Sequence, residues 1–200
     1  MKRYCLYAII LLSIYSCSYD QMEKTIFIPD ENDSNLPAYT EWGYNSFGAK
    51  YERLYFFAAN DIVPCKIIYR NGVLNFSLSG HIGSEYSIWH NNDVLTLTFS
   101  FPTSTISNYS DLLILHKKEF DLTDSSCEVK MTKNYQQEEI TLLSGRLNFK
   151  RVQLLRINDK ENRAILSGTF DMKFFRSDLP ETISSGRFDL GITEVYYMDK

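Results

Sequence analysis

The sequence predicts an all-β protein, an antiparallel β-sandwich or a partly open barrel with meander hairpins, preceded by an N-terminal signal and a flexible tether. Three observations favour this class. Fourteen tyrosines and thirteen phenylalanines supply the aromatic side chains that strands favour. Apolar and polar residues alternate through several long stretches. Asn71-Gly72 separates two of these stretches and supplies the two positive-φ residues of a type I′ hairpin turn.

The first residues, MKRYCLYAIILLSIYSC, have the layout of an export signal. Lys2 and Arg3 precede an apolar run of about 11 residues, which is shorter than the ~20 residues of a membrane-spanning helix. The last four residues, Ile14 to Cys17, resemble the lipobox of bacterial lipoproteins. This resemblance implies cleavage before Cys17, a diacylglyceryl group on its sulfur and an acylated amino terminus. We therefore expect a signal peptide over residues 1–16 and membrane attachment through lipid on Cys17.

Residues 17–40 are expected to comprise the lipidated cysteine and a flexible tether. Asp, Glu, Asn and Pro dominate this stretch, and Ile26-Phe27-Ile28 is its one apolar knot. The acidic run at 30–35 lacks the glycine and the distal glutamate of an EF-hand loop, so a solvated linker is favoured over a calcium site. The remaining residues, 41–200, are predicted to form a single all-β domain.

Charge and cysteine content limit the partners. The net charge of −4 becomes about −6 once Lys2 and Arg3 leave with the signal, and the chain has no basic block, so nucleic acid is not an expected partner.

Beside Cys17, the mature chain retains Cys65 and Cys127. Export places these two residues where disulfides form, but small apolar thiols are also often buried unpaired. A Cys65–Cys127 bridge and two free thiols therefore both remain open.

Local patterns predict the strands in order. A first strand is expected within residues 41–53. Between residues 149 and 152 the alternation of apolar and polar residues shifts by one position (the apolar parity slips), which indicates a bulge. One short helical turn is expected at residues 109–113. The other predicted strands cover residues 54–57, 65–70, 73–80, 94–101, 120–122, 127–131, 140–149, 152–157, 166–174 and 184–192.

Two stretches near the C-terminus are near copies of each other. Residues 167–171 read SGTFD and residues 185–189 read SGRFD, each within an alternating strand. Gly168 and Gly186 have the parity of the apolar residues, where a glycine leaves room for a crossing strand or a large ring. The irregular spacing of such segments favours a sandwich or barrel over a solenoid.

Several segments resemble a family of uncharacterised Bacteroidetes lipoproteins, a domain of unknown function (DUF5025). The segments that carry the resemblance, which extends over nearly the whole mature chain, are EWGYN at 41–45, SFGA at 46–49, LSGTF at 166–170 and GRFDLGI at 186–192. The resemblance implies a β domain and a lipoprotein location. It implies no activity and no functional residue.

The sequence contains no recognisable catalytic, cofactor or metal motif. His81, His90 and His116 lack metal-site spacing, and surface loops are favoured for the first two. The abundant carboxylates leave a glycosidase pair open without selecting one. Trp42 and Tyr44, which surround Gly43, are candidate binding aromatics, although a core-facing first strand is the favoured alternative.

Trp89 is a third candidate binding aromatic, because it lies in a polar loop where an exposed ring could stack on a sugar. Partial burial of that ring is the favoured alternative. No cofactor is expected.

The predicted function is presentation of a binding surface. A lipid anchor, a tether and one β domain suit a non-enzymatic lipoprotein of the outer membrane, facing outward or into the periplasm, that binds a protein or glycan partner. One alternative is a calycin-like carrier, for which a large aromatic-lined cavity would be the evidence. A second is a hydrolase, for which a cleft with two close carboxylates would be the evidence.

Overall fold

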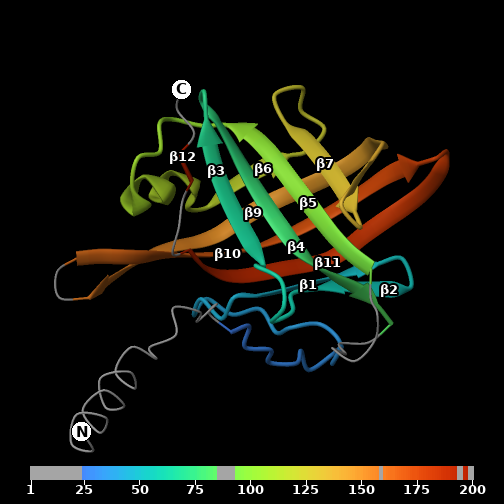
Figure 1. Ribbon diagram of the computed structural model, residues 1–200, viewed down its shortest axis with the longest axis horizontal. Helices are drawn as coiled ribbons and strands as arrows, with labels where there is room; N and C mark the ends of the chain where they lie inside the picture. Colours follow the sequence, from blue (N-terminus) through green and yellow to red (C-terminus); the bar gives the residue numbers. More distant parts are fainter. Residues whose placement is uncertain (1–23, 85–92, 158–159, 193–195, 198–200) are drawn as a thin grey trace, which may run out of the picture.

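The computed structural model describes residues 24–84, 93–157, 160–192 and 196–197, and it confirms the all-β prediction (Figure 1). The predicted signal, Cys17, Trp89 and His90 lie outside the described residues. The strands are β1 Ser46–Tyr51, β2 Leu54–Phe57, β3 Cys65–Arg70, β4 Val73–Gly83, β5 Asp93–Pro102, β6 Lys118–Asp121, β7 Glu128–Lys133, β8 Gln136–Glu138, β9 Ile140–Ile157, β10 Lys160–Arg176, β11 Leu179–Ile192 and β12 Tyr196–Tyr197.

The strands form one curled sheet in the order β6-β9-β10-β11-β1-β2-β4-β5-β7-β8, and every pair in this series is antiparallel. Strand β3 pairs with β4 as the predicted hairpin, and β12 adds to β3 in parallel. In Figure 1 the long strands β9, β10 and β11 run across β3, β4 and β5. The sheet thus curls into a half-barrel whose two parts face each other.

Strand β4 changes partner at Gly80. Its first part pairs with β3, and from His81 onward it pairs with β2. A Cβ at Gly80 would lie 2.1 Å from the carbonyl oxygen of Phe57 and 2.7 Å from the ring of Phe47. Because only a residue without a side chain allows this approach, Gly80 fixes where β2 meets β4.

Phenylalanine rings fill the space inside the curled sheet. Phe76 of β4 lies 5.2 Å, between ring centroids, from both Phe149 of β9 and Phe188 of β11. Phe99 of β5 lies 5.9 Å from Phe170 of β10 in the same way. Full burial of each ring contributes about 1.5–3 kcal/mol to folding. These rings occupy the place where a calycin-like carrier would hold its ligand, so the described interior gives that alternative no support.

The two glycines of the near copies make room for these rings. A Cβ at Gly168 would lie 2.6 Å from the ring of Phe188, and a Cβ at Gly186 would lie 2.8 Å from the ring of Phe170. Each near copy therefore supplies both a phenylalanine and the gap that the phenylalanine of the other copy occupies.

A 3₁₀ helix, η1 Tyr109–Leu115, forms at the predicted helical turn. The side chain of Asn108 accepts a hydrogen bond from the backbone N–H of Asp111, and the side chain of Asp111 accepts one from the backbone N–H of Asn108, which together form a capping box. Leu112 and Leu115 of η1 are buried in the core. His116 follows the helix and its Nδ1 accepts a hydrogen bond from the backbone N–H of Val152. No helix among the described residues has the length and hydropathy needed to cross a membrane.

The segment predicted as a flexible tether is, from residue 24 on, folded against the sheet. The backbone N–H of Ile26 donates to Tyr44 O (2.8 Å), and that of Ala38 donates to Ile28 O (2.7 Å). Leu36 is 1% exposed, and Pro37 packs so closely on Gly48 of β1 that a Cβ there would lie 2.3 Å from its ring. The acidic composition therefore does not make residues 24–40 a free linker.

Charged groups far apart in the sequence hold this segment in place. Asp33 pairs with Lys50 of β1 (2.8 Å), and Asp30 pairs with Arg187 of β11. Hydrogen bonding to the backbone of Asn32 contributes most to lowering the pKa of Asp30. The acidic run at 30–35 is therefore bound to basic strand residues.

Cys65 and Cys127 are both free thiols in the structure. Cys65 begins β3 and Cys127 directly precedes β7, and β4 and β5 lie between these strands. Three strand spacings are about 14 Å, whereas the Cα atoms of a disulfide lie within about 7 Å. Burial raises the pKa of the Cys65 thiol. The register of the sheet thus separates the two cysteines.

Candidate functional site

Residues 38–44, here called the strap, cross the face of β9, β10 and β11 that points away from the phenylalanine core. The strap is held by the carboxylate of Asp189, which is only 2% exposed. This carboxylate accepts hydrogen bonds from the backbone N–H groups of Trp42 (3.0 Å), Gly43 (2.7 Å) and Tyr44 (3.3 Å). Three consecutive amides on one carboxylate fix the path of the strap backbone.

Two hydroxyl groups complete the environment of Asp189. Thr40 Oγ1 donates to Oδ2 (2.6 Å), and Ser167 Oγ of β10 donates to Oδ1 (3.1 Å). An isolated buried carboxylate is very unfavourable, but one that accepts this many hydrogen bonds is stable. Gly43 has a φ of +76°, and a Cβ there would lie 3.1 Å from Ile165, so the turn of the strap requires glycine.

The strap is also fixed on β9. Glu41 forms an ion pair with Arg151 (2.6 Å), and its carbonyl accepts a hydrogen bond from Gln153 Nε2 (3.0 Å). The hydrogen bond from Arg151 lowers the pKa of Glu41. Tyr39 donates its hydroxyl to Glu41 Oε1 (3.0 Å), and the ammonium of Lys150 lies 5.2 Å from its ring centroid. The Tyr39 ring is therefore held in one position.

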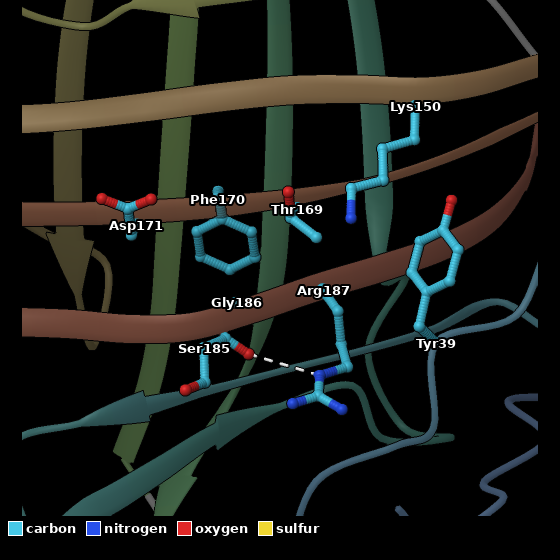
Figure 2. Close-up of a pocket in the computed structure, with 8 residues that line it drawn as sticks. All are labelled: Tyr39, Lys150, Thr169, Phe170, Asp171, Ser185, Gly186 and Arg187. Carbon is cyan, nitrogen blue, oxygen red and sulfur yellow. Dashed lines mark hydrogen bonds between the residues drawn. The ribbon is translucent and has the colours of Figure 1, made fainter.

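A pocket of about 350 Å³ opens on this face beside Tyr39 (Figure 2). Asp171 lies at one end of the pocket, Lys150 and Tyr39 lie at the other, and Thr169 lies between them (Figure 2). The lining comes from the strap and from three adjacent strands: Tyr39, Lys150, Thr169, Phe170, Asp171, Ser185, Gly186 and Arg187.

Two bulges shape the pocket. In β9 the register shifts at Lys150, as the slip in apolar parity predicts. In β11, Ser184 and Ser185 together stand opposite Asp171 of β10. Ser185 has a φ of +54°, a region that costs a non-glycine residue about 1 kcal/mol or more. Bulges and strained residues are enriched at functional sites, and both occur at this pocket.

Polar groups on the opposite part of the sheet are paired with each other. The hydroxyls of Ser77 and Thr98 lie 2.9 Å apart across β4 and β5, and those of Ser79 and Thr96 have the same spacing. Such cross-strand pairs satisfy the polar groups without a ligand.

The polar groups of the pocket are not paired in this way. Among the described residues, no hydrogen bond or ion pair engages the carboxylate of Asp171 or the hydroxyls of Thr169 and Ser185. The ammonium of Lys150 faces the Tyr39 ring and has no hydrogen bond or ion pair within the described ranges, whereas Arg187 is engaged by Asp30 and by the Ser185 carbonyl. The pocket therefore gathers one acceptor, one cationic donor and two hydroxyls that are available to a ligand.

A second hollow, of about 610 Å³, lies between β7–β8 and the β10–β11 turn. Its lining is acidic and includes Glu128, Glu138, Glu139 and Asp178. No group of three or more ligating side chains among the described residues could hold a metal ion. Glu138 of this hollow pairs with Arg176 of β10 (3.6 Å).

The candidate aromatics Trp42 and Tyr44, and also His81, lie outside the pocket lining. Trp42 is 72% exposed on the strap, while Tyr44 is half-buried and its backbone binds Asp189 and Ile26. Neither residue lies in a core-facing strand, since β1 begins only at Ser46. His81, expected in a loop, lies in β4 and its Nε2 contacts Asp61 (2.9 Å).

Sequence reasoning missed the pocket residues, although one signal pointed to them. The near copies end in Asp171 and Asp189, and the structure gives these two aspartates different roles. Asp189 is buried and binds the strap, whereas Asp171 is exposed in the pocket. Ser185, which begins the second copy, is the strained residue of the bulge.

Comparisons with family models, curated proteins and solved structures gave no match. The resemblance to Bacteroidetes lipoproteins therefore stays a prediction. The fold and the site together define the chain as a curled antiparallel sheet with a strap across its outer face and an open pocket beside the strap.

Proposed function

We propose that this protein is a non-enzymatic binding module of the cell envelope, attached to the outer membrane through lipid on Cys17, that binds a glycan or protein partner at the pocket beside the strap. The observation that carries the proposal is the pocket itself. Its volume of about 350 Å³ lies in the range of known ligand sites, about 300–1,000 Å³. Its aromatic wall is fixed by Glu41 and Lys150 before any ligand arrives.

The chemistry of the lining supports binding rather than hydrolysis. Of the eight lining residues, Asp171 alone carries a carboxylate, whereas most glycosidases use two. The lining includes no histidine that could act as a general base for the hydroxyl of Ser185 or Thr169, and no cysteine that could act as a nucleophile. These groups can hold a ligand by hydrogen bonds without reacting with it.

The folded segment from residue 24 onward also limits how far the domain can lie from its anchor. The described fold begins at Lys24, and seven residue steps from Cys17 reach at most about 25 Å. A tether that extended to residue 40 would instead reach about 80 Å. The proposal therefore places the domain close to the membrane surface, where its partner must also be accessible.

The anchor is tested by protease treatment of intact native cells that carry the full-length protein or its Cys17→Ala variant. If the protein faces outward through its lipid, protease cuts the wild-type domain on whole cells but not the variant. If both survive until the envelope is opened, the domain faces the periplasm. If the variant stays in the outer membrane fraction as the wild type does, lipid attachment through Cys17 is excluded.

The binding face is tested by replacing one lysine of the full-length protein with a photo-crosslinking lysine analogue. Lys173, exposed on β10 next to the pocket, is the test position, and Lys66, exposed on β3, is the control. We expect an adduct from position 173 on cells, lost when Asp171→Ala is added, and no such adduct from position 66. Equal adducts from both positions, or none from position 173, would contradict the proposed face.

A further inference from the structure

We infer that the ligand of the outer-face pocket is a neutral saccharide of about two rings, bound between Asp171 and Lys150 with one ring against Tyr39. This inference rests on the proposed function and adds the chemical class of the ligand. The inference rests on three features of the pocket: polar side chains without a partner among the described residues, the length of the pocket and its position within the sheet.

The charges of the pocket favour a neutral ligand. An anionic ligand would meet the unpaired carboxylate of Asp171, and a cationic one would meet the ammonium of Lys150. Arg187 cannot shift this balance, because its guanidinium is engaged by Asp30. A ligand without net charge that carries both donors and acceptors satisfies both ends at once.

Sugar hydroxyls have these properties, because each can donate and accept a hydrogen bond. One hydroxyl can donate to the carboxylate of Asp171, and another can accept from Lys150. The hydroxyls of Thr169 and Ser185 can pair with further ones, because neither has a partner among the described residues. The pocket thus offers complementary groups along its whole length.

The register of the strands gives the backbone spacing between the two ends of the pocket, from which we infer the length of the ligand. Lys150 bulges from β9 opposite Ser167 and Gly168 of β10, and Asp171 lies three residues beyond Gly168. At 3.3 Å per residue, these positions are about 10 Å apart. One sugar ring with its hydroxyls is shorter than this separation, whereas a disaccharide spans it. Tyr39 then supplies an aromatic wall for the ring at the Lys150 end.

The position of the pocket disfavours an extended peptide. Peptides commonly bind by adding a strand to a free sheet edge, where backbone groups are unpaired. The strand under the pocket, β10, is instead paired with β9 on one side and with β11 on the other. Recognition here must therefore use side chains, as in a saccharide site.

The inference is tested by isothermal titration calorimetry of the full-length, lipidated protein in detergent. The neutral probes are cellobiose, maltose and lactose, the acidic probe is 3′-sialyllactose, and a hexapeptide serves as the peptide probe. We expect at least one neutral disaccharide to bind. Its affinity should fall at least tenfold in Asp171→Asn and in Lys150→Met, since each removes one charge-assisted hydrogen bond.

The matched controls are Lys66→Met and Asp178→Asn, which change exposed residues outside the pocket lining and should leave the affinity unchanged. Binding of the acidic sugar or the peptide alone would overturn the inference, as would disaccharide binding that Asp171→Asn does not weaken. If no probe binds while position 173 still gives an Asp171-dependent adduct, the saccharide assignment fails and the proposed function stands. If that adduct is also absent, both fail.

Discussion

At the scale of single residues, two aspartates in near-identical segments have opposite roles. Asp189 is buried under the strap and accepts hydrogen bonds from three backbone amides, whereas Asp171 is exposed and unpaired among the described residues. The local sequences SGTFD and SGRFD are almost the same, so they do not explain the difference. It arises because the strap covers Asp189 and leaves Asp171 exposed. A pair of matched substitutions can therefore separate structure from function.

We expect Asp189→Ala to lower the free energy of unfolding by about 3 kcal/mol, because buried amide donors of the strap lose their acceptor. Asp171→Ala should change it by less than about 0.5 kcal/mol, as is usual for an exposed residue. Urea denaturation followed by tryptophan fluorescence measures both values. Similar losses in the two variants would show that Asp189 does not hold the strap.

The lowered pKa of Glu181 predicts how the free energy of unfolding depends on pH. Burial by itself would raise the pKa of Glu181, but hydrogen bonds from Arg176 (2.5 and 3.0 Å) and from the Tyr51 hydroxyl outweigh it and hold the pKa below its usual 4.5. A lowered pKa in the folded state stabilises the protein above pH 4.5. This stabilisation is lost as the pH falls below 4.5 toward the folded-state pKa.

We therefore expect the free energy of unfolding to fall between about pH 5 and pH 3, and to fall less in Glu181→Gln, which has no carboxylate to protonate. Urea denaturation at several pH values measures this slope. The control is Glu139→Gln, an exposed residue for which the wild-type slope is expected. An unchanged slope in Glu181→Gln would contradict this account.

At the scale of elements, the segment 24–44 behaves as part of the sheet. It contributes Leu36 to the buried residues, a Pro29–Pro37 bridge and the strap that forms one wall of the pocket. Its acidic residues form ion pairs with Lys50 and Arg187. The same composition that typifies a linker thus serves here to attach the segment to basic strands.

We expect the backbone amides of Ile26, Leu36 and Ala38 to exchange slowly with solvent deuterium, because each donates a hydrogen bond to another backbone carbonyl. Their exchange should be much slower than that of an unstructured peptide of the same sequence. Hydrogen exchange followed by NMR measures the rates residue by residue. Exchange at the rate of a free peptide would show that this segment is a flexible tether, as its composition predicts.

At the scale of the whole molecule, the curled sheet separates an inner apolar face from an outer polar one. The inner face is filled by phenylalanine rings, so the binding site that we propose lies on the outer face. On the outside, the hydroxyls of β4 and β5 pair with each other and Ser167 pairs with Asp189, whereas among the described residues the side chains of Thr169, Asp171 and Ser185 have no hydrogen-bond partner. We base the proposal that the pocket binds a partner on this contrast.

The fold was largely predictable from the sequence, but the site was not. Asn71-Gly72 defined the β3–β4 hairpin, and the parity slip after Phe149 located the bulge of β9, because both signals are local. Trp42 was a candidate binding aromatic although a core-facing strand was favoured, and nothing near Tyr39 in the sequence indicated that its ring would face Lys150. The pocket arises only when distant segments meet.

The sequence by itself determined the all-β class, most strand positions and the helical turn, because alternation and turn residues act over a few neighbours. Only the tertiary structure decided that Asp189 binds amides 145 to 147 residues away, that Cys65 and Cys127 lie apart, and that Tyr39 faces a pocket. The physical reason is register. Which side chains meet across antiparallel strands depends on pairings and bulges throughout the sheet, and no short stretch of sequence contains that information.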